Sequence, residues 1–109
     1  MLETIERLYD EIHGPKLTPY ELIENVKLPN YTSVEFSKDS ENNIIAYTKC
    51  LLEDGSNAIF TYVFNKENKL MSLNCMVRGS EEEVYNRKTE IEKFYLLASQ
   101  SLQPSLKAI

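Results

Sequence analysis

Four segments rich in β-branched and aromatic residues constrain the fold more than any other feature of this sequence. They cover residues 32–37, 44–52, 58–64 and 70–77. Short clusters of polar, turn-forming residues separate them, namely Ser40-Glu41-Asn42-Asn43, Asp54-Gly55-Ser56-Asn57 and Asn65-Lys66-Glu67-Asn68. Connections this short allow antiparallel neighbours and exclude the long crossover that parallel strands need. The sequence therefore predicts a four-stranded antiparallel β-meander.

A register follows if each polar cluster is treated as a two-residue turn. The second cluster then places Tyr47 opposite Tyr62. The third places Tyr62 opposite Leu73, and the first places Phe36 opposite Lys49. This register also decides which side chains share a face of the sheet, because successive residues of a strand point to opposite faces.

The predicted register divides the meander into a bulky face and a smaller-sided face. We expect helices to cover the bulky face. It collects Val34, Phe36, Ile45, Tyr47, Leu51, Phe60, Tyr62, Phe64, Met71, Leu73, Cys75 and Val77. The other face collects Ser33, Glu35, Ser37, Ile44, Ala46, Thr48, Cys50, Ile59, Thr61, Val63, Ser72, Asn74 and Met76.

Three helices are predicted outside the meander. Residues 2–13 carry apolar side chains at three- and four-residue spacing. Residues 19–26 follow a capping box, Thr18-Pro19-Tyr20-Glu21, with proline at the first helical position. Residues 81–102 follow a second capping box, Ser80-Glu81-Glu82-Glu83, and stop before Pro104. We expect one α+β domain over residues 1–109, with two N-terminal helices and one long C-terminal helix packed on one face of the sheet.

Composition and charge narrow the functional classes. No apolar run approaches the roughly 18 residues of a membrane span. Acidic residues open the chain where a signal peptide would carry a basic stretch, so we expect a cytoplasmic protein. The net charge of −5 argues against binding nucleic acid. The predicted register puts Cys50 and Cys75 on opposite faces, which predicts two free thiols.

The candidate residues for catalysis are few. His13 is the only histidine, so any nucleophile that needs an imidazole base depends on it. Asp10 and Glu11 lie beside it, and carboxylates together with an imidazole are the groups that a metal site or a general base uses. Its place directly before Gly14 also fits a cation at the end of a helix, and we favour that interpretation. We predict no cofactor, no metal and no catalytic residues, and we lean against an enzyme.

Two binding sites are predicted from the register. Tyr47, Lys49, Phe60 and Tyr62 share the bulky face, where they would line an aromatic pocket for a small molecule under the C-terminal helix. The alternative for these residues is a filled core with tyrosine hydroxyls at its rim.

The smaller-sided face predicts a second kind of site. It is too apolar for full exposure and lacks the large side chains of a second core. The residues that we expect in a protein interface there are Ala46, Thr48, Ile59, Thr61 and Val63. A half-exposed sheet face is the plainer alternative. Our leading hypothesis is a small non-enzymatic protein-interaction module of adaptor, chaperone-like or inhibitor type that forms a homodimer through this face. The small-molecule binding module is the second hypothesis.

Overall fold

The computed structural model describes residues 2–14 and 16–108, and they divide into two compact units. One unit contains α1 (Leu2–Ile12) and α3 (Arg87–Ala108), and the other is the chain from Lys16 to Asn86. The second unit carries α2 (Pro19–Asn25) and the sheet. The expected packing of the long helix on the sheet, and the single domain over residues 1–109, concern how these units combine and stay predictions.

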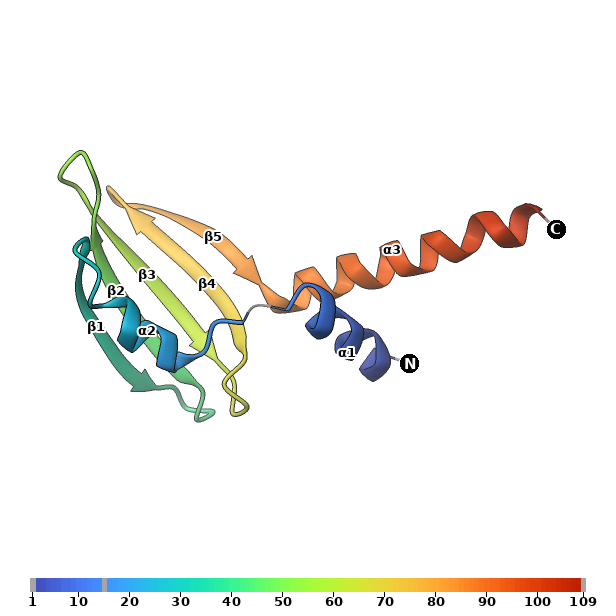
Figure 1. The fold of residues 1–109 in the computed structure, drawn as a ribbon, viewed down its shortest axis with the longest axis horizontal. Coiled ribbons are helices and arrows are strands. Elements are labelled where there is room, and N and C mark those ends of the chain that lie inside the picture. The colour runs from blue at the N-terminus through green and yellow to red at the C-terminus, as the bar shows by residue number, and fades with distance from the viewer. Residues whose placement is uncertain (1, 15, 109) are drawn as a thin grey trace. The chain divides into compact units, whose positions relative to one another are not determined.

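The sheet has five antiparallel strands in chain order, as Figure 1 shows. They are β1 (Tyr31–Lys38), β2 (Ile44–Leu51), β3 (Asn57–Phe64), β4 (Leu70–Val77) and β5 (Ser80–Asn86). The α+β class and the antiparallel meander are confirmed, and the four expected strands have bounds within one residue of those predicted.

The fifth strand corrects the prediction that a helix begins at residue 81. Arg78 and Gly79 both have positive φ, 52° and 77°, and Val77 pairs with Ser80 across them. Two successive left-handed residues make the tight reversal that suits the twist of a β-hairpin. The chain therefore returns along β4, and pairing with β4 outweighs the local helix-start pattern of residues 80–83. The long helix begins only at Arg87, and it continues past Pro104 to Ala108.

The three meander connections share one geometry. The backbone N–H of Leu52 bonds to the carbonyl of Ser56 at 2.8 Å, which leaves residues 53–55 as the loop. Residues 39–43 and 65–69 close in the same way. The third loop residue is left-handed each time, with φ of 65° at Asn42, 87° at Gly55 and 63° at Asn68. These are three-residue loops, a type I turn followed by a left-handed residue, and they are one residue longer than predicted.

The extra loop residue turns over β2 relative to the prediction. Tyr47 pairs with Thr61 and not with Tyr62. Between β3 and β4 a bulge at Val63 and Phe64 restores the predicted register, so Tyr62 does pair with Leu73. On the other side Phe36 pairs with Ala46 in place of Lys49. Only β2 is inverted, because a one-residue slip moves every side chain of a strand to the other face.

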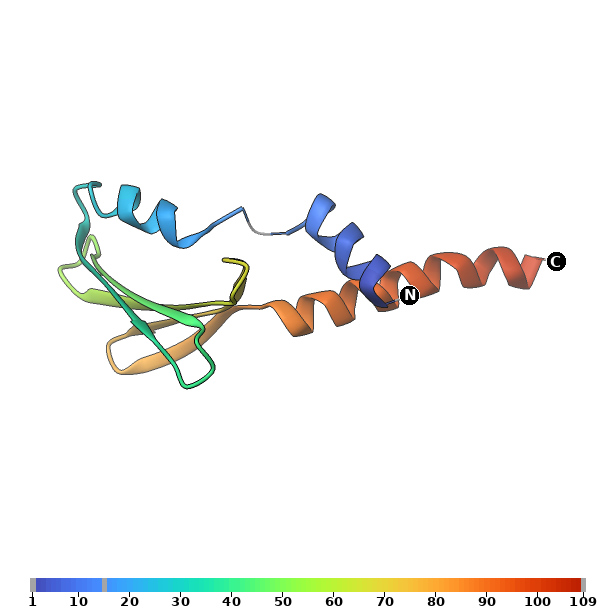
Figure 2. The ribbon, with the colours of Figure 1, turned by 90° about the horizontal axis from the view of Figure 1, so that it is seen from below.

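The core of this unit lies between the sheet and α2. Figure 2 shows α2 on one side of the sheet; we call the side that faces α2 the covered face and the opposite side the open face. Leu22 of α2 is fully buried against the strands. The strand residues buried with it are Ala46, Tyr62, Phe64 and Leu70. Tyr62 and Phe64 stack, with ring centroids 6.1 Å apart.

The start of α2 is confirmed in detail. The Glu21 carboxylate accepts a hydrogen bond from the backbone N–H of Thr18 at 2.8 Å, as expected for a capping box. The hydroxyl of Thr18 also donates to this carboxylate, and these bonds hold the pKa of Glu21 below its ordinary value. The cap fixes where α2 begins and therefore which of its residues meet the sheet.

In the other unit, α1 packs on α3 through aromatic rings and the ion pair between Asp10 and Arg87. Tyr9 and Ile91 are buried, and the Tyr9 ring meets the edge of Phe94 at 5.9 Å between centroids. The Arg87 guanidinium lies 2.6 Å from the Asp10 carboxylate and is 8% exposed. The predicted first helix, residues 2–13, is confirmed as Leu2–Ile12.

The left-handed loop position predicts the effect of Gly55→Ala. A Cβ at Gly55 meets no atom within 4 Å, so the cost is conformational only. We expect the free energy of unfolding to fall by about 1–2 kcal/mol, measured by urea denaturation. An unchanged free energy would show that the loop is not held in this conformation.

The hydrogen bonds to Asp39 predict that the stability of the fold depends on pH. The side chain and backbone N–H of Asn43 both donate to Asp39, and the Glu41 N–H donates to it at 2.8 Å, which lowers the pKa of Asp39 below 3.8. A lowered pKa stabilises the fold above the unfolded value, and this contribution disappears as pH falls through the folded value. Asp39→Ala should therefore destabilise the protein at neutral pH and progressively less below about pH 4.

Asn65 is the control for this experiment, since its uncharged Oδ1 accepts the same two loop bonds, from the N–H groups of Glu67 and Lys69. Asn65→Ala should lower the free energy of unfolding by the same amount at every pH, as measured by a series of urea denaturation curves. A parallel pH profile for Asp39→Ala and Asn65→Ala would contradict the role of the ionised carboxylate.

Candidate functional site

The open face of the sheet carries the most unusual surface of residues 16–86. Six apolar side chains on β2, β3 and β4 point to this side, and we call them the open-face patch: Ile45, Tyr47, Leu51, Ile59, Val63 and Met76. Four of them are large and exposed, with 41% of Tyr47, 48% of Leu51, 37% of Ile59 and 42% of Met76 accessible. Apolar side chains gathered on one face mark interaction sites more often than the same residues scattered singly.

The strand register shows that the patch is continuous. Ile59 lies directly between Lys49 and Met76, and Val63 is directly opposite Ile45. Thr61, half-buried, sits between these two rows. Directly opposite side chains have Cβ atoms about 4.5–5.5 Å apart, so Ile45 and Val63, and likewise Ile59 and Met76, are within contact distance.

The open-face patch also has a hollow beside it and a polar border. A hollow of about 250 Å³ lies against Tyr47, Lys49 and Ile59 and reaches Ser33 and Glu35 on β1. On the far edge, Glu81 pairs with Met76 and therefore faces the same side. A surface that combines projecting apolar side chains, a hollow and a charged border has the general anatomy of a protein interface.

The structure divides the interface residues that were predicted from the sequence. Ile59, Thr61 and Val63 lie on the open face, as expected. Ala46 and Thr48 lie on the covered face, where Ala46 is fully buried and Thr48 is 1% exposed. Their assignment to the open surface was wrong because the loop before β3 has three residues and turns β2 over.

The predicted ligand pocket is not assembled. Phe60 and Tyr62 are on the covered face, where Tyr62 is 6% exposed and their rings lie 6.4 Å apart. Tyr47 and Lys49 point to the open face. The inversion of β2 that separates these pairs also places Tyr47 and Lys49 on the open face. No single cavity can be lined by all four residues.

The two cysteines share the covered face, contrary to expectation, and both are free thiols. The strand β3 separates them and they lie in different rows of the sheet, so their Cα atoms are more than two strand spacings, or about 9.5 Å, apart, which is beyond the reach of a disulfide. Burial raises the pKa of the Cys50 thiol above its ordinary value of 9.0. The thiol is therefore protonated near neutral pH and is a weak nucleophile.

His13 belongs to an aromatic cluster. Its ring lies 5.8 Å from Phe94 and 6.2 Å from Tyr9, and its backbone N–H bonds to the carbonyl of Tyr9 at the end of α1. Asp10, which we considered as its partner in a metal site or general base, pairs with Arg87. Among residues 2–14 and 16–108 no group of three or more potential metal ligands gathers.

Comparison of the chain with known protein families, curated proteins and solved structures finds no match. None of the helices in the described part of the chain has the length and hydropathy needed to cross a membrane.

Two tyrosines on opposite faces provide a direct test of the register. Tyr62→Ala removes a buried ring and should lower the free energy of unfolding by about 3–5 kcal/mol. Tyr47→Ala removes a ring from the open face and should cost about 1 kcal/mol or less. Chemical denaturation of the two variants measures both values. Large costs for both variants would show that the predicted two-residue turn, which puts both rings on the covered face, and not the observed loop sets the face of β2.

Proposed function

We propose that this chain is a non-enzymatic protein-interaction module that binds through the open face of its sheet and associates with a second copy of itself. The observation that carries the proposal is the open-face patch, in which large apolar side chains of three adjacent strands lie together and partly exposed. Burying this surface against another protein would remove it from water, the main favourable contribution to association.

Self-association is supported by the make-up of the patch. A two-fold symmetric dimer requires one self-complementary surface and no second partner site. The projecting Tyr47 and Met76 and the hollow near Glu35 and Ile59 offer both shapes on one face. Lys49 lies on the open face opposite Ile59, and Glu81 lies at the border of the patch, so a second copy can present a carboxylate to each ammonium.

Several chemical features support a protein partner in the cytoplasm and no catalysis. Two free thiols suit a reducing compartment. The net charge of −5 favours a protein partner over a nucleic acid. The buried, protonated Cys50 and the aromatic packing of His13 leave both without the activation that a nucleophile or general base requires.

The proposal predicts the effect of Val63→Glu on the oligomeric state. Val63 lies inside the patch, so a carboxylate there would have to lose water in the interface without a partner. We expect wild type to form dimers at high concentration and Val63→Glu to be monomeric, as measured by sedimentation equilibrium. A wild type that is monomeric at its highest soluble concentration would contradict self-association.

Leu28→Glu is the matched control. Leu28 is 50% exposed and lies between α2 and β1, outside the patch, so a glutamate there adds the same charge away from the proposed interface. This variant should dimerise like wild type. Circular dichroism of both variants shows whether the sheet is retained, and equal dissociation of both would assign the effect to net charge and not to the patch.

A further inference from the structure

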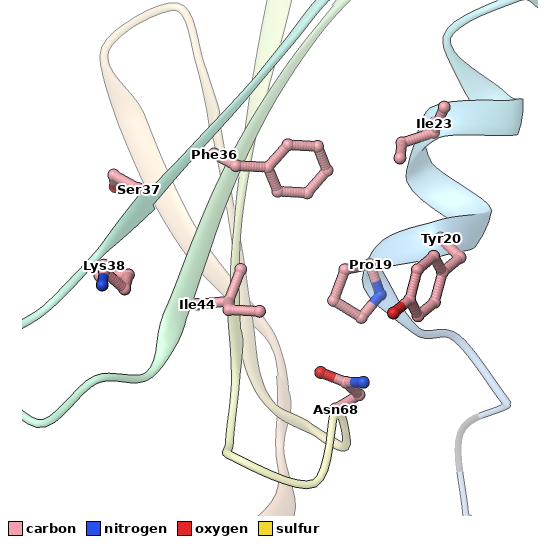
Figure 3. A pocket seen from close by; sticks show the side chains of 8 residues that line it. All are labelled: Pro19, Tyr20, Ile23, Phe36, Ser37, Lys38, Ile44 and Asn68. Carbon is pink, nitrogen blue, oxygen red and sulfur yellow. The ribbon is translucent and has the colours of Figure 1, made fainter.

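A second hollow, unrelated to the open-face patch, lies on the covered face between α2 and the strands. Figure 3 shows Pro19, Tyr20 and Ile23 of α2 on one side of it and Phe36 and Ile44 of the strands on the other. Its volume is about 500 Å³, within the range of small-molecule sites in proteins. Residues 16–86 supply its whole lining.

The apolar side chains around this cleft are only partly covered by one another. Tyr20 is 68% exposed, Ile23 48% and Phe36 43%. Leu22 of the same helix is fully buried, so α2 contacts the sheet through Leu22, whereas Tyr20 and Ile23 lie at the edge of that contact. The cleft is therefore a bounded apolar hollow at the margin of a filled core.

Polar side chains of the lining lie at two places, Ser37 and Lys38 on β1 and Asn68 at the other end. Lys38 pairs with Ile44 and lines the strand side of the cleft. Figure 3 places Asn68, from the loop between β3 and β4, at the end of the cleft beside Pro19 and Tyr20. No acidic residue lines the cleft.

The charge of the cleft is positive and uncompensated. Among the described residues the Lys38 ammonium makes no ion pair. The neighbouring Asp39 directs its carboxylate to Asn43 and Glu41 in the loop. An apolar hollow with one cation, an amide and no carboxylate selects an anion with an apolar body.

We infer that this cleft binds a small amphipathic carboxylate. Its aliphatic or aromatic body lies between Ile23, Phe36 and Ile44, and its carboxylate lies toward Lys38. A volume of about 500 Å³ holds a small molecule but not a packed helix, whose diameter with side chains is about 10–12 Å. The site is on the face opposite the open-face patch and is independent of the proposed function.

The test is an NMR titration of the full chain with decanoate, below its micelle concentration, following the isoleucine methyl groups. We expect saturable shifts at Ile23 and Ile44 and none at Ile45 and Ile59 on the open face. Decan-1-ol, with the same chain and no charge, should bind more weakly, and decyltrimethylammonium more weakly still. Equal affinity for the three compounds, no saturable binding, or shifts centred on the open face would overturn the inference.

Two lysines on opposite faces of the sheet separate the role of the charge from general electrostatics. Lys38→Gln should weaken decanoate binding about three- to fivefold, the range of an exposed ion pair, and leave decan-1-ol binding unchanged. Lys49→Gln removes the same charge from the open face and should change neither. If both variants lose decanoate affinity equally, Lys38 does not recognise the carboxylate and the inference fails.

Discussion

The number of residues in the meander loops is the constraint on which the rest of the sheet depends. Each loop has three residues, and the last is left-handed: Asn42, Gly55 or Asn68. A loop shorter by one residue on each side of β2 would bring Tyr47 and Lys49 under α2 and turn Ala46 outward. Both the composition of the core and the character of the open face follow from this local backbone geometry.

Most elements were predictable because their signals are local, whereas the face of β2 was not. An aspartate followed by glycine suits the centre of a two-residue turn, and it equally suits the end of a three-residue loop with Gly55 left-handed. The bulge at Val63 corrected the same error between β3 and β4. The strand β5 was missed because its acidic start resembles a helix start, and only pairing with β4 makes it a strand.

Only some residues of the open face could be predicted from the sequence. Ile59, Thr61 and Val63 were placed correctly because they lie on one strand, whose alternation needs no knowledge of its neighbours. Met76 was also predicted on this face, whereas Tyr47 and Leu51 join the patch only when β2 has its observed register. The cleft beside Phe36 combines α2 with the β1–β2 hairpin and with Asn68 from a later loop, and no periodicity within these segments signals that contact.

The acidic strand β5 has a consequence for the chain in concentrated solution. An edge strand is a template on which further chains can add backbone hydrogen bonds and extend a sheet into a fibril. Glu81, Glu82 and Glu83 are consecutive and exposed on this edge. A second chain stacked in register would align like charges about 4.8 Å apart, so growth of aggregates from this side is electrostatically blocked while the three carboxylates are ionised.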